Sequence, residues 1–493
     1  MIKYVKFSLV LIGLMTLCAC TTLKNTDPQA ENPKAGVKIY QPSKNSAAPA
    51  DKIACSAALI RLDQLALQSA GTLSANRIPA MPWLRHSRLI TSDIRIQTSA
   101  DDIAQLLRRM SSLAIKGLTY EVAVVPKASI NQWRQRYQIN LPTHRFITQC
   151  SAQLVKNQLK NPQAALRRLK SIPSDDDYST LARVAGLYPI ATVPFRSGVV
   201  NEQRQLAKEW GQVSDKQWYQ YKPTSPTRIN TASHWQQLLA AHAPVWLIDS
   251  ATGPNLPGAP FWQGDVLKVN TQQPTTYAFV SEARWQQQSI TQLNYIIWFS
   301  ERPRLKRLDW VAGQHDAVVF RVNLNQKGAV IAYDSIHLCG CWYRLFLPPG
   351  QPFKINHHYW QEPVLMSRVQ LPVGSSPRMA VYLAADTHQI QYLSPAAEVA
   401  KASVRITQGY QQKPFSTLLS LPHSSGVKPV FNRQGYVTGS KRPERWLFWP
   451  MGVKNPGALR RFGDHAISFV GRRYFDDPHL LERVSGFNHV GKL

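Results

Sequence analysis

Apolar side chains recur at helical spacing through residues 52–240. Cys55, Leu59 and Leu62 stand at i, i+4 and i+7, which places them on one face of a helix. A second apolar stripe begins at Ile103, behind a capping serine and two early acidic residues. The pattern predicts a helical N-terminal domain over this range.

The pattern then changes to short β-rich runs separated by Pro, Gly and Asn. Phe320, Val322 and Leu324 are apolar and alternate with polar residues, which predicts a strand with one buried face. Arg321 and Asn323 would lie on its solvent face. The four residues that follow end in glycine and predict a hairpin turn.

Many such runs predict an antiparallel β-rich domain, sandwich- or barrel-like, over residues 241–408. The fold class predicted for the whole chain is therefore α+β. Beyond that range, apolar runs at 446–450 and 465–470 predict strands or buried segments. They belong to a C-terminal extension, residues 409–493, which we expect to pack on the β-rich domain.

Composition supports buried cores and adds a strong positive charge. The 493 residues are 44% hydrophobic, which excludes wholesale disorder. The 58 Lys and Arg residues outnumber 29 Asp and Glu residues, so the formal net charge is +29. Such a charge favours anionic partners, although a solvated basic surface with no dedicated partner would explain it equally well.

The N-terminus predicts the compartment. Lys3 and Lys6 precede an apolar run that is too short to span a bilayer, in the order typical of a secretory signal. The sequence Leu17-Cys18-Ala19-Cys20 that follows resembles the lipobox of bacterial lipoproteins.

The resemblance implies a signal peptide over residues 1–19 and acylation of Cys20, which anchors the chain to the membrane. Because no Asp follows Cys20, it also implies the outer membrane, with the protein facing the periplasm. Residues 20–51, rich in Asn, Pro, Ala, Lys and Ser, would form a flexible tether. Nucleic acid is scarce in that compartment, so the expected partners are anionic envelope polymers or another envelope protein.

Two cysteines in the helical range are candidates for a disulfide. Cys55 and Cys150 both lie on apolar helix faces, and the periplasm is oxidising. A bridge closing so long a loop would stabilise the fold by roughly 4 kcal/mol in the chain-entropy model. The alternative is a pair of free buried thiols.

The densest group of chemically capable side chains lies at residues 333–344. His337, Cys339 and Cys341 would share one face of a strand, and Arg344 follows them. On a straight strand the two cysteines would be roughly 6.6 Å apart, at about 3.3 Å per residue. Gly340 stands between them and permits the bend that would bring the sulfur atoms together.

A metal site is one hypothesis for this motif. His337, Cys339 and Cys341 could supply three ligands and either His357 or His358 a fourth, a set that zinc or copper would suit. The alternatives are a redox-sensitive thiol pair or two ordinary buried thiols. His388 and His315 are more distant candidates for a metal ligand. In addition, Asp309, His315 and Asp316 could join His337 in a polar cluster.

A cysteine nucleophile is a second hypothesis. Gly340 and Cys341, with Arg344 after them and His337 before, resemble the Ser-His-Gly-Cys turn of the periplasmic L,D-transpeptidases. The resemblance implies an enzyme that acts on cell-wall peptide, with Cys341 as the nucleophile and His337 or Arg344 lowering its pKa. The sequence departs from that pattern at Cys339, where the family has His.

A third hypothesis is a non-enzymatic protein that binds envelope polyanions through its basic surface and its aromatic residues. The sequence carries no phosphate-binding loop, no dinucleotide fingerprint and no H-E-x-x-H or G-x-S-x-G motif. The three hypotheses therefore stay open at the level of the sequence.

Overall fold

The structure is a computed structural model of the whole chain. It describes residues 50–73, 75–96, 99–171, 176–224, 233–350, 360–372 and 377–485, with only the backbone of residues 50–54. Residues 51–493 form one compact unit. The signal peptide, the tether and the acylation of Cys20 lie outside the described residues and stay predictions. Among the described helices, none combines the length and the apolar character needed to cross a bilayer.

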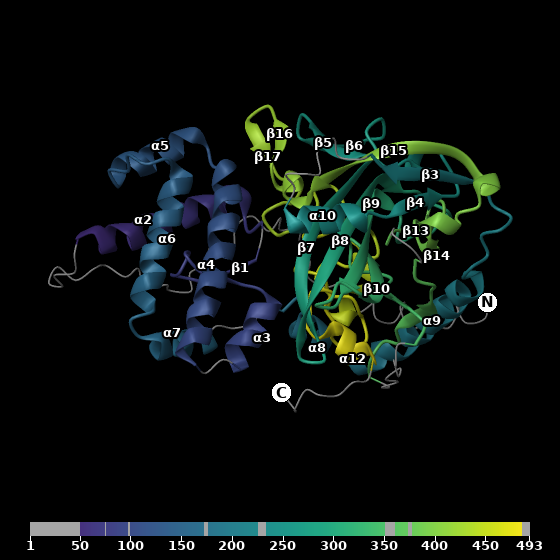
Figure 1. Cartoon of the computed structure of the whole chain (residues 1–493), viewed down its shortest axis with the longest axis horizontal. Coiled ribbons are helices and arrows are strands. Elements are labelled where there is room, and N and C mark those ends of the chain that lie inside the picture. Colours follow the sequence, from purple (N-terminus) through teal and green to yellow (C-terminus); the bar gives the residue numbers. More distant parts are fainter. Residues whose placement is uncertain are drawn as a thin grey trace, which may run out of the picture. The chain divides into compact units, whose positions relative to one another are not determined.

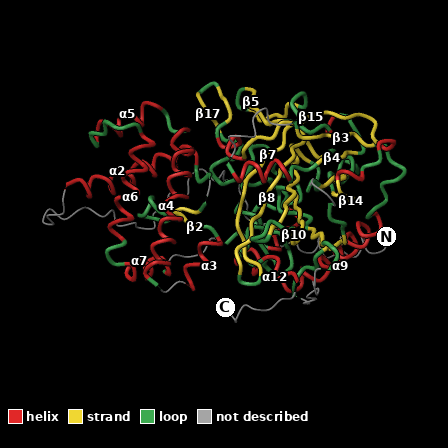
Figure 2. Tube along the Cα trace, viewed as in Figure 1, coloured by secondary structure: helices red, strands yellow, loops and turns green. Residues whose placement is uncertain are grey.

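The helical prediction for the N-terminal part is confirmed (Figures 1 and 2). Its helices are α2 (Ala50–Ala70), α3 (Arg88–Ile96), α4 (Ala100–Ala123), α5 (Lys127–Arg136), α6 (Thr143–Gln158) and α7 (Pro162–Lys170). Leu59, Leu62 and Ile103 are buried in one apolar core that these helices share. Helix α4 begins after Ser99, whose side chain accepts the Asp102 backbone N–H.

A disulfide joins two of these helices. Cys55 of α2 and Cys150 of α6 are bonded to each other, as the sequence predicted, with their Cα atoms 5.3 Å apart. Cys150 is buried within the helical core. The bridge therefore ties together segments separated by 95 positions along the chain.

A mixed eleven-stranded sheet organises the rest of the described chain (Figure 1). Its order is β12-β11-β10-β9-β8-β7-β15-β3-β4-β13-β14. The bounds are β3 (Trp218–Pro223), β4 (Val245–Ile248), β7 (Thr275–Trp285), β8 (Gln288–Arg302), β9 (Gly313–Leu324), β10 (Val330–His337), β11 (Arg344–Leu347), β12 (Leu365–Arg368), β13 (Met379–Leu383), β14 (Ile390–Pro395) and β15 (Val404–Pro414). The helical-then-β order predicted for an α+β fold is thus observed.

The sheet differs from the predicted one in two respects. Strands β7 to β11 are antiparallel, but β15 runs parallel to both β3 and β7, and β12 and β13 also make parallel pairs. Strand β3 lies inside the range predicted to be helical, because its aromatic residues fit a pleated surface and the helical pattern had ended before it. The remaining small strands, β1 (Asn76–Arg77), β2 (Arg85–His86), β5 (Ala259–Gln263), β6 (Val266–Asn270), β16 (Leu421–His423) and β17 (Gly426–Lys428), form two-stranded sheets.

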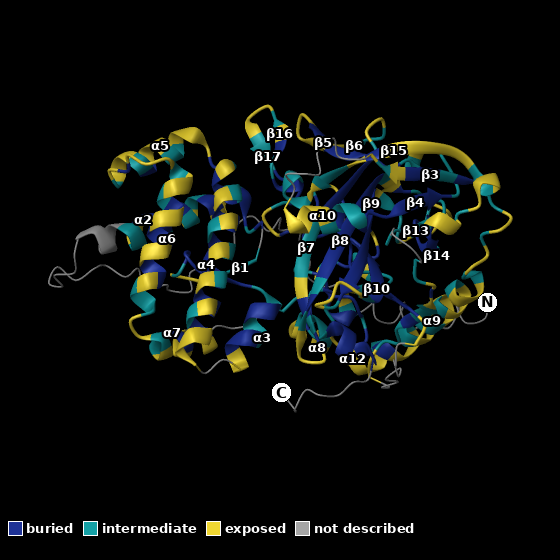
Figure 3. Ribbon diagram, viewed as in Figure 1, coloured by how far each residue is buried: buried dark blue, intermediate teal, exposed yellow. Residues whose placement is uncertain are grey.

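The prediction that Arg321 and Asn323 face solvent is wrong. Strand β9 is buried on both faces, and both side chains have no measurable exposure (Figure 3). The Arg321 guanidinium forms a two-pronged ion pair with Asp334 of β10 and donates to the Phe475 carbonyl at 2.8 Å. Asn323 donates to the same Asp334 carboxylate at 3.0 Å.

The C-terminal extension supplies the cover for that face. Leu418, Phe431, Leu459 and Phe475 are buried in the same apolar cluster as the strand residue Val319. Of the two runs predicted to be strands or buried segments, neither is a strand, and the second is mostly buried. Residues 445–451 form the short helices α11 (Arg445–Phe448) and η5 (Trp449–Met451), and residues 465–470 make only one isolated bridge.

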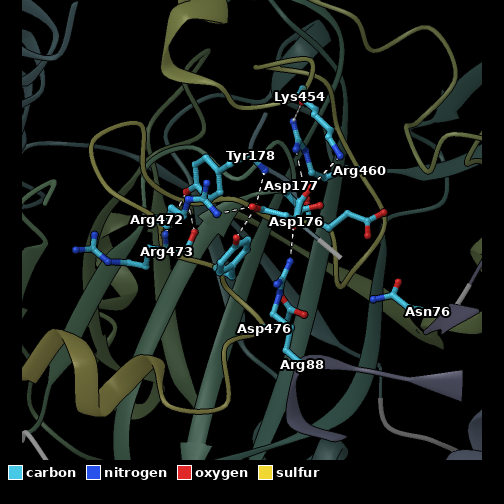
Figure 4. Close-up of polar contacts among 12 residues, drawn as sticks. Asn76, Arg88, Asp176, Asp177, Tyr178, Lys454, Arg460, Arg472, Arg473 and Asp476 are labelled. Carbon is cyan, nitrogen blue, oxygen red and sulfur yellow. Dashed lines mark hydrogen bonds and ion pairs between the residues drawn. The ribbon is translucent and has the colours of Figure 1, made fainter. Parts of the chain in front are cut away.

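Helix α3 is tied to the extension by a buried ion cluster (Figure 4). The Arg88 guanidinium contacts Asp177 at 2.6 Å and Asp476 at 3.1 Å. Burial raises the pKa of Asp177 to about 6 and that of Asp476 to about 7, although Arg88 opposes the rise. Beside them, Tyr474 donates to the neighbouring Asp176 at 2.6 Å.

Removing the disulfide tests its contribution. In the double variant Cys55→Ala/Cys150→Ala we expect the free energy of unfolding of the full chain to fall by ~4 kcal/mol, because the unfolded chain regains the entropy of a long loop. Chemical denaturation measures the change. Reducing the unsubstituted chain should give the same loss, and a loss below ~1 kcal/mol in both experiments would contradict the assignment.

Candidate functional site

The residues of the central motif form a tight turn between β10 and β11. The His337 N–H donates to the Cys341 carbonyl at 3.0 Å, and the Gly340 N–H donates back to the His337 carbonyl at 2.8 Å. Beyond the turn, Arg344 pairs with Ser335 in the antiparallel ladder. The bend that the sequence required at Gly340 is therefore present.

Glycine is the only residue that fits at the centre of this turn. Gly340 has a φ of +90°, where a side chain is strained. A Cβ atom there would also overlap the carbonyl oxygen of Ala466, in the C-terminal extension. The extension holds the turn further through the Arg460 N–H, which donates to the Leu338 carbonyl at 3.0 Å.

The turn places the two thiols in contact without a disulfide. Cys339 and Cys341 are unbridged, and each thiol shifts the pKa of the other. The Cys341 backbone N–H also donates to the Cys339 sulfur at 3.4 Å. A pair of this kind carries one thiolate more easily than two, because the second thiol stabilises the first negative charge.

The two thiols have different acidities. Burial raises the pKa of Cys339, but the hydrogen bond from Cys341 and the positive charge of Arg442 outweigh burial, so its pKa is lowered. The same hydrogen bond, together with burial, raises the pKa of Cys341 well above its ordinary value. Cys339 is therefore the more acidic of the two thiols.

Both cysteines line a cavity of about 300 Å³. Its described walls come from helix α9 (Tyr188–Glu209), the thiol turn, the ends of β8 and β11, the segment leading into β12, and the extension. They include the ionisable residues Glu202, Arg302, Arg344, Glu362 and Glu444. The size and the mixture of apolar walls with a few charged groups are typical of a small-molecule or peptide-side-chain site.

Glu444 is the acid of this cavity that is poised to exchange a proton. It is buried, and burial raises its pKa to about 7 against the opposing charges of Arg442 and Arg302. One of its carboxylate oxygens has no hydrogen-bond partner within the described residues. A carboxyl group with a pKa near neutrality can accept or donate a proton at physiological pH.

The predicted polar cluster around His337 exists, and Asp316 is its centre. The Asp316 carboxylate contacts Nδ1 of His337 at 3.3 Å, Nδ1 of His388 at 2.9 Å and a guanidinium nitrogen of Arg442 at 3.1 Å. Burial acts to raise the pKa of Asp316, but the neighbouring His337 and Arg442 hold it well below its usual value. His315, also predicted, contributes its backbone carbonyl to Arg442 at 3.0 Å.

The contact with Asp316 holds His337 where it does not serve as a metal ligand with the thiols or as the base of Cys341. Burial lowers the pKa of His337, and its ring packs against Trp342 with centroids 4.7 Å apart. The described residues that line the cavity do not include His337. Its Nε2 atom has no hydrogen-bond partner anywhere in the described part of the chain. Arg344 lines the cavity, but its guanidinium donates to the Ile390 carbonyl and to Ser367.

The predicted metal site is not formed by the described ligands. No three His, Cys, Asp or Glu side chains in the described part of the chain are grouped so that they could hold a metal ion. The imidazole of His337 contacts the Asp316 carboxylate, whereas the Cys341 backbone N–H donates to the Cys339 sulfur. The imidazole and the two thiols therefore do not converge on one point. His357 and His358, the fourth-ligand candidates, lie outside the described residues.

Two residues of the site were not predicted. Arg442 and Glu444 lie about a hundred positions after the thiols, in the run Lys441-Arg442-Pro443-Glu444-Arg445, whose composition is typical of a solvated surface. Both are buried in the structure. No periodicity or spacing in the sequence separates such a run from an exposed one, so only the tertiary contact identifies them.

A glycine substitution tests the geometry of the turn. In Gly340→Ala we expect the free energy of unfolding to fall by ~3 kcal/mol, because the positive φ and the overlap with Ala466 both act against the new Cβ. The matched control is Gly328→Ala, at a φ of +78° with open space around it, which should cost only ~1 kcal/mol. Equal losses, measured by denaturant unfolding, would contradict the close contact with the extension.

No protein-family model, no curated protein and no solved structure matches this chain. Its functional assignment therefore depends on the chemistry of its own side chains. The strongest grouping of such chemistry in the described residues is the thiol pair with Glu444 at the wall of the cavity, with the charge of the buried Arg442 acting on Cys339.

Proposed function

We propose that the protein is a lipid-anchored envelope protein that exchanges electrons between its Cys339–Cys341 pair and a disulfide substrate. One observation carries the proposal: two unbridged thiols lie two positions apart in one tight turn at the wall of a cavity, where the Cys341 backbone N–H donates to the Cys339 sulfur at 3.4 Å. The compartment rests on the resemblance of Leu17-Cys18-Ala19-Cys20 to a lipobox. An oxidising compartment supplies disulfide partners for such a pair.

The exchange would proceed in two steps. The Cys339 thiolate attacks one sulfur of the substrate disulfide, and the other substrate sulfur leaves as a thiolate. Cys341 then loses its proton and attacks Cys339 in the mixed disulfide, which closes the Cys339–Cys341 bond and releases the second substrate thiolate. Two electrons pass to the substrate, and the reverse reaction returns them.

Glu444 is suited to take the proton that Cys341 must lose. It lines the same cavity as both thiols, and its pKa of about 7 allows it to accept a proton at neutral pH. Its negative charge also raises the pKa of both cysteines, so its protonation favours the thiolate. The acid and the thiols would therefore titrate as one unit.

The alternative of a cysteine nucleophile on cell-wall peptide has less support in the described geometry. It requires a base at Cys341, and the described walls of the cavity offer Glu444 but no imidazole. The test below separates the two chemistries, since a nucleophile needs one sulfur and the exchange needs both.

The thiol pair can be tested directly in the full chain. In buffers of varied glutathione ratio we expect Cys339 and Cys341 to convert together between dithiol and disulfide, with a mass change of two hydrogens. Reduction of oxidised glutathione should be more than about tenfold slower in both Cys339→Ser and Cys341→Ser.

The double variant Cys55→Ala/Cys150→Ala is the control and should keep the exchange. A pair that stays reduced at every glutathione ratio contradicts the proposal. So does full activity in either single variant with loss only in the other, because that result would mean a single nucleophile.

The pH dependence of thiol reactivity tests Glu444. Because ionised Glu444 raises the pKa of both thiols, Glu444→Gln should move the midpoint of iodoacetamide alkylation at Cys339 to lower pH, by about one unit. The exposed Glu398→Gln is the control and should leave the midpoint in place. A midpoint unchanged, or moved to higher pH, in Glu444→Gln would show that this carboxylate does not act on the thiols.

A further inference from the structure

An exposed apolar surface lies next to the walls of the cavity. Helix α8 (Thr180–Ala185) and the start of α9 carry large apolar residues that point to solvent: Leu181, Val184, Leu187, Ile190 and Val193. Leu181 is 79% exposed, and α8 has no buried residue at all (Figure 3). Surface helices ordinarily bury their apolar stripe. Five exposed apolar residues spaced three positions apart therefore indicate a surface that binds another molecule.

Two tryptophans from the extension belong to the same surface. The backbone at Gly186 approaches Pro450 so closely that a Cβ would overlap it, and Arg183 donates to the Met451 carbonyl at 2.9 Å. Helices α11 and η5 are thereby fixed beside α8. From this position Trp446 is 69% exposed, and Trp449 is also exposed.

The loop between β8 and β9 contacts the extension just before α11 and adds exposed apolar residues. Its Trp310 carbonyl accepts the Glu444 backbone N–H at 2.9 Å, which fixes the loop beside Trp446. Leu305, Leu308 and Trp310 are exposed there, Leu308 to 77%. The docking surface, as used below, consists of these three residues, Trp446, Trp449 and the five residues of α8 and α9.

The charged residues within the segments of the docking surface are mostly positive, although Glu301 at the end of β8 and Glu202 of α9 are exposed nearby. The loop exposes Arg304, Lys306 and Arg307. Its one acid, Asp309, accepts the backbone N–H groups of Leu305 and Val311 within the loop. Residues 180–200 contain two arginines and no acid. In residues 441–454 the only acid, Glu444, is buried, while Lys441 and Lys454 are exposed.

We infer that the docking surface binds the anionic face of a lipid bilayer, with its aliphatic and indole groups inserted among the headgroups. Exposed aliphatic side chains supply the apolar area that such binding requires. Tryptophan favours the membrane interface, where its ring is apolar and its N–H is wet. The exposed Lys and Arg side chains outnumber Asp309, the one acid of these segments that is not buried. They complement anionic lipid, by about 1 kcal/mol per cation near the surface.

The inference is independent of the thiol chemistry and of the acyl anchor. It also gives the cavity a position, because Phe195 of α9 and Phe448 of α11 form part of its wall. Their rings contact each other with centroids 5.1 Å apart. A surface that docks on a bilayer would thus hold the cavity at the level of the headgroups.

Vesicle binding of the predicted mature chain tests the inference. Every protein begins at residue 20 and carries Cys20→Ser, so that neither an acyl chain nor the predicted signal peptide contributes. The docking variant is Leu181→Glu/Leu308→Glu/Trp446→Glu. The matched control, Leu67→Glu/Ile96→Glu/Trp235→Glu, changes exposed residues of α2, α3 and α10 (His234–Ala241). We expect the docking variant to bind phosphatidylethanolamine–phosphatidylglycerol vesicles at least about tenfold more weakly, and the control to bind like the parent.

Several results would overturn the inference. Equal binding of the docking variant and the control is one, provided that both unfold at the temperature of the parent. Equal binding of the parent to phosphatidylcholine and to phosphatidylglycerol vesicles is another, because it removes the role of the cations. If the parent self-associates without lipid and the docking variant does not, the surface is an interface between copies of the chain.

Discussion

The buried carboxylate of Asp316 is the interaction on which the architecture around the site depends. It contacts groups from the end of β10, the segment between β13 and β14, and the C-terminal extension. A buried charge is costly unless it is paired and hydrogen bonded, so His337, His388 and Arg442 must take these positions together. The same Arg442 also lowers the pKa of Cys339. One ion cluster therefore sets both the position of the turn and the acidity of its first thiol.

The two cysteine pairs show how differently the fold uses the same atom. Cys55 and Cys150 join helices far apart in sequence, where a bridge limits the unfolded chain. Cys339 and Cys341 are two positions apart, so a bridge between them would close almost no loop and add little stability. Their contact is instead maintained by Gly340, by the backbone bonds of the turn and by the extension. A pair that contributes little to stability is free to change its redox state.

The sequence predicted what depends on local pattern and missed what depends on distant contacts. The helical stripe at Cys55, Leu59 and Leu62 and the bend at Gly340 follow from residue spacing and from glycine's conformational range, and both are present. The alternation around Arg321 was misinterpreted, because the extension covers the face that was assigned to solvent. The positive charge of Arg321 favours an exposed position, and the sequence does not show that the buried Asp334 carboxylate pairs with it.

The candidate site was predicted in part for the same reason. The thiols and the Asp316–His337 contact lie close together in the chain or in one hairpin, so the sequence suggested them. Glu444 and Arg442 reach the site only through the path of the extension, which no local pattern encodes. The predicted convergence of imidazole with both thiols failed because Asp316 binds His337 from the neighbouring strand.

The contact between Gly340 and Ala466 has a consequence for the order in which the molecule is built. A ribosome delivers the thiol turn more than a hundred residues before the segment that closes over it. Throughout that interval the nascent chain has both sulfur atoms uncovered and the Asp316 carboxylate without its guanidinium. The turn that holds Cys339 and Cys341 is therefore completed late, by a long-range contact. Until that contact forms, other thiols and oxidants can reach the two cysteines.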